Sequence, residues 1–293
     1  MGSRQKDLAI GTVLGDILRR AAAEVEETLP AALADEPDAV HQHRVRVRRL
    51  RSVLAGFEDS LDTGQADRLR VAYAEWGSQL GVVRDIEVRA SVAAETLEDA
   101  GITDPAIIRR LVDSERDAYP AAHARLVELA ASPRAQERAR TLERFVEAMY
   151  VVDHDRPAEP ALAEVLRAQV KRVRTAARRL DESTERFHDL RKAARRARYV
   201  AEAVADAVPD FAPHTVQAIA EAGDDLHDAL GGHRDLTLLA QHARQEGARA
   251  AHAGERSEDY EAIAVLAEDA AAELLADVGP AVRQLRAAAS DLP

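Results

Sequence analysis

The segment HQHRVRVRRLR at residues 41–51 decides the fold expected for this chain, because it returns as HDLRKAARRAR at residues 188–198. One histidine and four arginines keep the same spacing in the two copies, which lie 147 positions apart. A second motif follows each copy, LGVVRD at residues 80–85 and LGGHRD at residues 230–235. The chain is therefore duplicated in its cationic residues, which favours a polyanion site built by both halves.

Apolar residues recur at helical spacing along almost the whole chain, and strand-type alternation is nearly absent. This pattern predicts an all-α fold. The duplicated motifs indicate two antiparallel helical bundles related by internal duplication, and duplications of this kind often pack with pseudo-two-fold symmetry. The most linker-like segment, at residues 153–160, lies between the two copies. We therefore expect one domain over residues 1–293, with an N-terminal half over 1–153 and a C-terminal half over 154–293.

Glycine and proline residues divide the helical pattern into segments. Pro120 lies inside one of these segments and is expected to kink or split the helix. The predicted helices cover about 4–29, 37–58, 65–80, 83–100, 104–131, 134–151, 160–182, 185–208, 213–230, 233–253 and 258–289.

The net charge of −12 at pH 7 argues against a general nucleic-acid binder, because such proteins carry a positive field over a whole face. Basic clusters within a negative body leave only a concentrated site able to hold an anion. Cysteine is absent, which excludes disulfides and thiolate metal sites. No stretch approaches the roughly 20 apolar residues of a membrane-spanning helix. We therefore expect a cytoplasmic protein with no membrane partner and no specific nucleic-acid partner.

The basic residues of the first copy form a stripe beside the apolar face of their helix. With His41 at zero, Arg44, Arg48 and Arg51 fall at about 300°, 340° and 280°, and the apolar residues fall between about 160° and 240°. A charged stripe beside the core face is typical of a cleft between packed elements, whereas a solvated charged stripe usually lies opposite the core. Residues 39–57 contain no acidic residue. Because local ion-pair partners are missing, a bound anion is the favoured counterion.

A third basic stripe precedes the second copy. Arg167, Lys171, Arg174 and Arg178 are spaced i, i+4, i+7 and i+11, which places them on one side of a helix. The corresponding helix of the first half carries glutamates instead. The second half is therefore expected to contribute more positive charge to the site.

The two Leu-Gly-x-x-Arg-Asp motifs have two interpretations, which stay open at this point. Their glycines can end one helix, and Asp85 and Asp235 can favour the first turn of the next. Alternatively, Arg84 and Arg234 contribute to the anion site. Trp76, a few residues earlier, is expected in the core.

No catalytic pattern combines a nucleophile, a base and an orienting group, so we expect no enzymatic activity. His41 and His188 have no histidine or carboxylate at i+4 on their face of the helix, which disfavours a metal site. We expect these imidazoles to donate hydrogen bonds to the anion or to satisfy a buried helix contact. The sequence accordingly predicts no metal and no cofactor, and it leaves the oligomeric state open.

The duplicated His-x-x-Arg and Leu-Gly-x-x-Arg-Asp motifs resemble those of the CHAD family, the conserved histidine α-helical domain, over nearly the whole chain. The resemblance implies two helical bundles around a basic pore, binding of inorganic polyphosphate, and targeting to polyphosphate granules. Ala197 and Lys192 depart from the leucine and valine of the first copy. These two changes alter packing more than charge.

The residues expected to bind polyphosphate come from the motifs and from the third stripe. They are His41, Arg44, Arg48, Arg49, Arg51, Arg84, Arg167, Lys171, Arg174, Arg178, His188, Arg191, Arg195, Arg196, Arg198 and Arg234. Two alternatives stay open. One is a metal-dependent polyphosphate or triphosphate hydrolase that uses Asp85 and Asp235. The other is a metal-chelating or phosphohistidine protein that uses His41 and His188.

Overall fold

The computed structural model describes residues 8–61, 63–181 and 183–293, and within these ranges it is helical with no β-strand. Two isolated β-bridges join Ala9 to Pro157 and Leu61 to Val151. The all-α prediction is confirmed. The expected start of the first helix at residue 4 lies outside the described residues.

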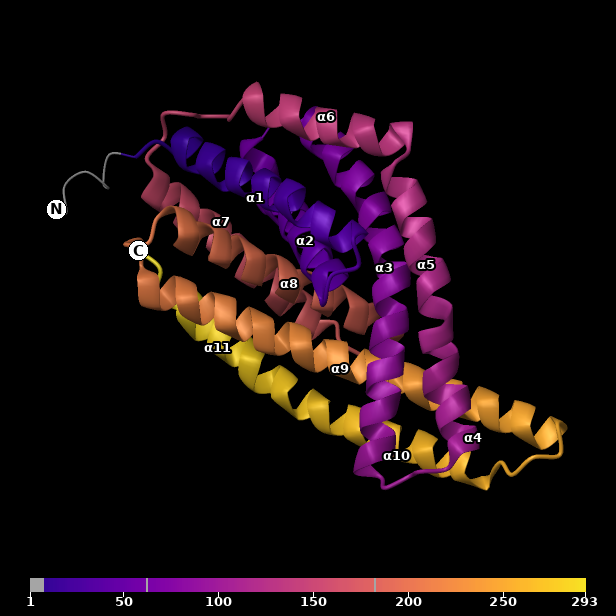
Figure 1. Ribbon diagram of the computed structural model, residues 1–293. Helices are drawn as coiled ribbons and strands as arrows, with labels where there is room; N and C mark the ends of the chain where they lie inside the picture. The colour runs from indigo at the N-terminus through magenta and orange to yellow at the C-terminus, as the bar shows by residue number, and fades with distance from the viewer. Residues whose placement is uncertain (1–7, 62, 182) are drawn as a thin grey trace.

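In the part of the chain before the predicted linker, α3 (Thr63–Asp99) and α5 (Ser114–Ala130) form a long hairpin (Figure 1). Helix α6 (Pro133–Glu147) begins at a side-chain cap: the Ser132 hydroxyl accepts a hydrogen bond from the Ala135 amide at 3.2 Å, and a proline occupies the first helical position. The elements are α1 (Ile10–Leu33), α2 (Ala39–Gly56), the 3₁₀ turn η1 (Glu58–Ser60), α3 (Thr63–Asp99), α4 (Pro105–Ile108), the π-helical turn η2 (Arg109–Asp113), α5 (Ser114–Ala130) and α6 (Pro133–Glu147).

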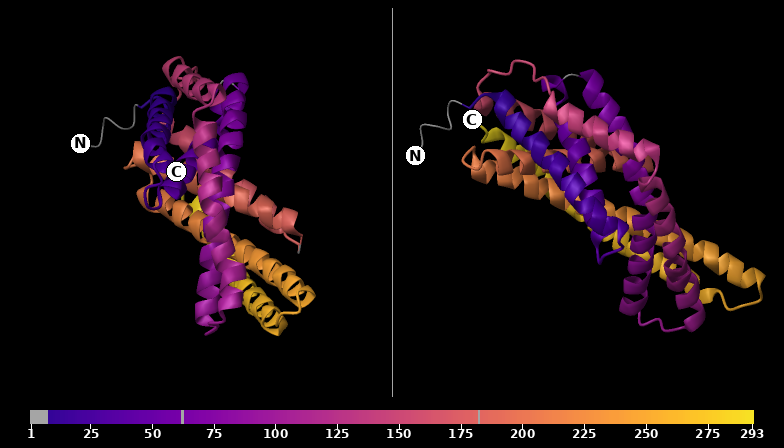
Figure 2. Two further views of the ribbon diagram at one scale, coloured as in Figure 1. Left: turned by 45° about the vertical axis from the view of Figure 1, so that its right-hand side comes forward. Right: turned by 45° about the horizontal axis from the view of Figure 1, so that its top comes forward.

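The helices after the linker include a second long hairpin, made by α9 and α10. The elements are α7 (Ala158–Arg178), α8 (Thr184–Ala207), α9 (Pro213–His252), α10 (Glu258–Leu274), the 3₁₀ turn η3 (Leu275–Asp277) and α11 (Val278–Ser290). The α3–α5 hairpin crosses the α9–α10 hairpin, and Figure 2 shows the crossing from two sides.

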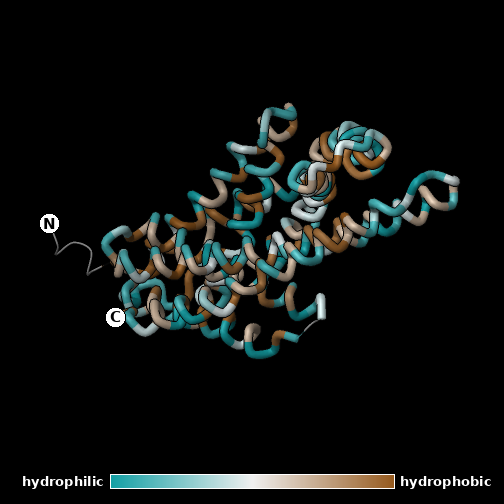
Figure 3. The backbone as a smooth tube through the Cα atoms, turned by 90° about the horizontal axis from the view of Figure 1, so that it is seen from below, coloured by the Kyte–Doolittle hydropathy of each residue, from teal (hydrophilic) through white to brown (hydrophobic). Residues whose placement is uncertain are grey.

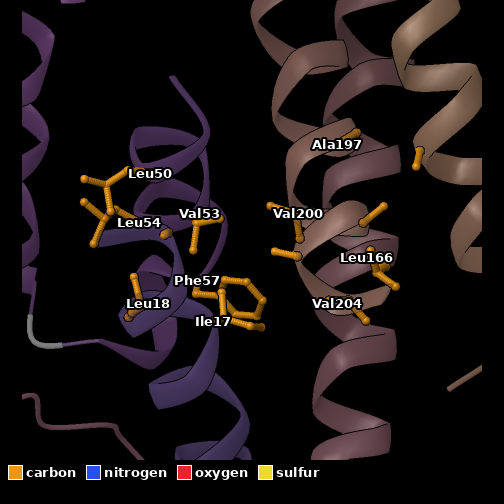
Figure 4. Close-up of a cluster of buried hydrophobic side chains, with 14 of the residues drawn as sticks. Ile17, Leu18, Leu50, Val53, Leu54, Phe57, Leu166, Ala197, Val200 and Val204 are labelled. Atoms are coloured by element: carbon orange, nitrogen blue, oxygen red, sulfur yellow. The ribbon is translucent and has the colours of Figure 1, made fainter. Parts of the chain in front are cut away.

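The main core joins the two parts of the chain. Val53 of α2 faces Val200 of α8, with apolar side chains of α1 and α7 behind them (Figure 4). Both valines are fully buried. Gly56 allows this close approach, because a Cβ at that position would lie 2.3 Å from a methyl group of Val200. The packing fixes α2 and α8, which carry the two basic segments, side by side.

A second core lies where the two long hairpins cross. Leu97 and Leu111 from the first part of the chain meet Leu239 and Tyr260 from the second. Both cores thus take residues from both sides of the linker. The division of the chain at residues 153 and 154 stays a prediction.

Several predicted helix boundaries are wrong. The segments expected over 65–80 and 83–100 are one helix, α3, and those over 213–230 and 233–253 are one helix, α9. Gly81 and Gly231 lie inside these helices without a positive φ. Neither glycine therefore has the left-handed conformation with which a glycine ends a helix.

Proline positions explain two further differences. The helix expected over 258–289 breaks at η3, one turn before Pro280, because proline offers no amide to the carbonyl one turn earlier. In contrast, α5 continues through Pro120, and the regular helix is interrupted upstream at η2 instead. Packing of α5 against α3 outweighs the single backbone hydrogen bond that Pro120 removes.

Hydrophobic and hydrophilic residues are mixed along the helices (Figure 3). Within the described ranges, no helix is both long and apolar enough to cross a membrane.

Candidate functional site

A hollow of about 470 Å³ lies between α2, α3 and α8, and we call it the α2–α3–α8 hollow. It brings together Arg48 and Arg51 of the first basic segment with Arg195 and Arg196 of the second. The full lining consists of Arg48, Arg51, Ser52, Ala55, Asp67, Arg70, Val71, Ala74, Lys192, Arg195 and Arg196.

The charges around this hollow are strongly unequal. Its walls carry six basic side chains and a single carboxylate, that of Asp67. This carboxylate already accepts a hydrogen bond from Arg70 at 2.9 Å. Arg48, Arg51 and Arg195 form no ion pair with any carboxylate among the described residues. The hollow is therefore a concentration of uncompensated positive charge in a chain of net charge −12.

Two arginines of α8 show the cost of this arrangement. Burial, followed by repulsion from Arg48, lowers the pKa of Arg195 to about 9 and that of Arg191 to about 10. Both lowered pKa values mean that the folded protein holds these cations at an energetic cost. Arg195 lines the hollow and Arg191 does not, so an anion bound in the hollow would relieve the repulsion and the poor solvation of Arg195 directly.

His227 of α9 is a further residue beside Arg48 that the sequence did not mark, and we call these two residues, with Arg44, Arg191, Arg195 and Arg234, the basic cluster. Arg48 donates a hydrogen bond from Nη2 to Nε2 of His227. Burial, followed by the neighbouring guanidinium of Arg48, lowers the pKa of His227 to about 2, so the imidazole is neutral. Because its Nε2 accepts, its proton lies on Nδ1. The repeat does not point to His227. When the two Leu-Gly-x-x-Arg-Asp motifs are aligned, the residue equivalent to His227 is Gly77.

Three buried donors in this cluster have no hydrogen-bond partner in the described part of the protein. They are Nε of Arg48, Nε of Arg191 and Nδ1 of His227. Buried donors are nearly always paired in folded proteins. Of these three residues only Arg48 lines the α2–α3–α8 hollow, so the unpaired donors mark an incompletely satisfied interior beside it.

The glycines of the two Leu-Gly-x-x-Arg-Asp motifs make room for arginines. A Cβ at Gly81 would lie 2.7 Å from Nη1 of Arg44, and a Cβ at Gly231 would lie 3.1 Å from Nη2 of Arg191. The interpretation in which these glycines end a helix is therefore wrong. Each is a point where a basic segment crosses α3 or α9 closely.

The aspartates of these motifs lie one turn after the glycines and face the same arginines. Asp85 lies 3.8 Å from Nη2 of Arg44 and 4.0 Å from Nη2 of Arg234. Arg234 also pairs with Asp235 at 3.0 Å. Burial raises the pKa of Asp235, against the opposite effect of Arg191. These carboxylates partly neutralise the inner end of the basic cluster, and Arg84 pairs separately with Glu87 at 3.1 Å.

The histidines of the basic segments differ in exposure. His41 is half-buried, and burial together with Arg84 lowers its pKa. His188 is exposed, and its pKa is lowered by desolvation and by Lys192. Both imidazoles are therefore mainly neutral at pH 7, so they can donate hydrogen bonds without adding charge.

His43 and Trp76 belong to the core. His43 accepts a hydrogen bond from Trp76 Nε1 at its Nε2 (2.9 Å), and its Nδ1 lies 2.9 Å from the Thr28 hydroxyl. Burial lowers the pKa of His43 to about 4. The prediction that Trp76 is a core residue is confirmed, since only 3% of it is exposed.

Three arginines expected at the site have protein partners elsewhere. Arg49 pairs with Asp206 and with Glu24. Arg198 pairs with Glu202 and with Asp224. The third, Arg167, donates hydrogen bonds to the carbonyls of the last two residues of the chain.

The stripe on α7 is only partly turned toward α8. Lys171 lines a second hollow, of about 560 Å³, which we call the α7–α8 hollow. Arg174 is half-buried and Arg178 is exposed, and neither lines this hollow. Arg172 and Arg179, which the stripe did not include, line it instead.

No group of three or more histidine, aspartate or glutamate side chains is arranged to hold a metal ion in the part of the chain that the structure describes. The basic side chains make the hollows suited to anions.

The chain belongs to the CHAD family. The family model, described as CHAD domain, matches residues 16–244, which is most of the chain. The CHAD domain of the plant Ricinus communis has a similar structure, with a TM-score of 0.64 at 20% sequence identity, covering 99% of this chain and 94% of the plant chain. PptA from Streptomyces chartreusis gives a TM-score of 0.63 at 22% identity and covers 96% of this chain and 99% of that protein. At these identities the structural matches establish the fold alone.

Relatives of similar sequence occur in Mycobacterium tuberculosis. The uncharacterized proteins Rv2226 (strain ATCC 25618 / H37Rv) and MT2285 (strain CDC 1551 / Oshkosh) are each 28% identical to this chain over 264 residues. The match covers 84% of this chain and 48% of each relative. The chain thus spans about half the length of these curated relatives.

Proposed function

We propose that the protein binds inorganic polyphosphate in the α2–α3–α8 hollow. The observation that carries this proposal is the set of six basic side chains against one carboxylate, in a chain whose net charge is −12. A linear polyanion replaces many counterions at once, whereas a single phosphate neutralises only one or two of these cations. Arginine forks also match the geometry of phosphate oxygens.

The equivalent glycine contacts support a site shared between two related halves. Arg44 lies against Gly81, and Arg191 lies against Gly231, so the two basic segments cross α3 and α9 in the same way. We propose that the halves 1–153 and 154–293 contribute one basic helix each to a central cleft, around a pseudo-two-fold axis.

The surroundings of the hollow favour polyphosphate over nucleic acid. The second half places Asp206, Asp224 and Glu202 against Arg49 and Arg198. These ion pairs remove Arg49 and Arg198 as free cations outside the hollow, which leaves little for the broad backbone of a duplex to contact, whereas a narrow phosphate chain can follow the hollow alone.

We further propose that binding is not coupled to hydrolysis and that it directs the protein to polyphosphate granules. The only carboxylate in the wall of the hollow, that of Asp67, is occupied by Arg70. It is therefore poorly placed to act as a base toward a bound phosphate.

A competition experiment tests this function. The protein is bound to labelled long-chain polyphosphate and is then challenged with unlabelled polyphosphate, duplex DNA or orthophosphate, and phosphate release is followed with added divalent metal. We expect displacement by polyphosphate only, and no release. Equal displacement by DNA would contradict the binding proposal, and steady phosphate release would favour the hydrolase.

A further inference from the structure

The two basic hollows adjoin each other across α8. Lys192 and Arg196 line the α2–α3–α8 hollow on one side and the α7–α8 hollow on the other. The α7–α8 hollow is as basic as the first, because its walls carry six basic side chains and one carboxylate, that of Asp189. Together the two hollows present ten different basic side chains and two carboxylates.

A single carboxylate lies at the junction of the two hollows. Glu58, in η1, is 3.3 Å from Nη1 of Arg70 and 2.8 Å from Nη2 of Arg172. Arg70 lines the first hollow and Arg172 lines the second. Glu58 thus holds one arginine of each hollow toward the other.

The junction keeps a net positive charge. Burial, followed by repulsion from Arg172, lowers the pKa of Arg196, and the attraction of Glu58 only partly offsets this. One carboxylate cannot neutralise the three arginines around it. No acidic barrier therefore separates the two hollows among the side chains that line them.

We infer that the α7–α8 hollow continues the binding path, so that the preferred ligand is a linear polyphosphate long enough to cross α8 over Lys192 and Arg196. This inference rests on the proposed function of the α2–α3–α8 hollow. A short oligophosphate fills one hollow only. A long chain occupies both and exchanges more counterions, which strengthens its binding.

The test compares two ligands on three variants. The distal variant, Lys171→Ala, Arg179→Ala and Arg186→Ala, changes only side chains of the α7–α8 hollow and leaves the Arg172–Glu58 pair intact. The central variant is Arg51→Ala, Arg195→Ala. The charge-matched control removes three exposed arginines that line neither hollow: Arg19→Ala, Arg116→Ala and Arg125→Ala.

The affinities for tripolyphosphate and for long-chain polyphosphate are measured by calorimetric titration at one salt concentration. We expect the distal variant to lose at least about tenfold in affinity for the long chain and to keep its affinity for tripolyphosphate within about twofold. The central variant should lose affinity for both ligands, and the control should retain both.

The outcomes separate the two proposals. An unchanged long-chain affinity in the distal variant overturns the continuous path, and so does an equal loss for both ligands. In either case binding by the wild-type protein leaves the proposed function intact. If the wild-type protein binds neither ligand, the proposed function fails and the continuous path fails with it.

Discussion

Replacement of Arg195 by methionine should make the free protein more stable while weakening polyphosphate binding. Arg195 lies among Arg48, Arg191 and Arg51, and burial followed by these charges lowers its pKa to about 9. The difference from the ordinary pKa of arginine, 12.5, corresponds to about 5 kcal/mol, because one pKa unit is worth about 1.4 kcal/mol. The side chain is only half-buried, so water screens part of this cost, and we expect a gain of about 2 kcal/mol.

Helix α8 also carries a matched control, Arg198, whose replacement is expected to change the stability in the opposite direction. Arg198 pairs with Glu202 at 2.7 Å and with Asp224. The Arg198→Met variant leaves these two carboxylates without their cation, and we expect it to lose about 1–2 kcal/mol of stability. The two variants carry the same chemical change, so helix propensity and net charge do not distinguish them.

Urea unfolding followed by circular dichroism measures both free energies, with and without polyphosphate. Since the pKa of Arg195 is lowered, its cost is fully present at pH 7 and decreases as the pH rises above about 9. The advantage of Arg195→Met should therefore shrink in alkaline buffer. A neutral or destabilised Arg195→Met variant at pH 7 would refute the reasoning, because Arg195 would then be neutralised within the protein.

Three further predictions follow from the contacts around the cluster. Gly81→Ala should lower polyphosphate affinity several-fold in a titration, since its Cβ would displace the guanidinium of Arg44, and an unchanged affinity would contradict this contact. Asp85→Asn should raise that affinity several-fold, because it removes the carboxylate shared by Arg44 and Arg234, and weaker binding would contradict this role. The contribution of His43 to the free energy of unfolding should fall by about 3 kcal/mol as the pH falls from 6.5 to about 4, because the imidazole takes up a proton more readily in the unfolded chain than in the folded protein. A His43→Gln variant should lose this pH dependence in urea titrations, and retention of it would place the titrating group elsewhere.

Local periodicity was sufficient to predict the helical class but not the continuity of the long helices. Gly81 and Gly231 resemble helix ends in the sequence, and only the arginines packed against them explain why the helices continue. Those arginines come from segments about 40 residues away along the chain. A helix boundary at such a glycine depends on a tertiary contact, which local spacing does not contain.

The sequence is sufficient to recognise the two basic segments. It does not show which of their arginines form ion pairs within the protein and which do not. Arg48 and Arg195 line one hollow as their helical positions suggest. Arg49 carries the same kind of charge but pairs with Asp206, which is 157 residues away. Helical spacing shows only carboxylates on the same helix, so it does not identify a partner on α8. His227 was missed for a similar reason, because its contact with Arg48 joins α9 to α2.

Calorimetric titration of long-chain polyphosphate at two salt concentrations tests the central claim most directly. The six basic side chains of the α2–α3–α8 hollow alone predict that the logarithm of affinity falls with the logarithm of salt with a slope of about −4, taking about 0.7 per neutralised phosphate as for single strands. The slope is steeper than this where the chain also occupies the α7–α8 hollow. An Arg48→Ala, Arg51→Ala, Arg195→Ala variant should bind far more weakly and with a shallower slope. Binding that is absent at low salt, or that is unchanged in this variant, would contradict a polyphosphate site between α2, α3 and α8.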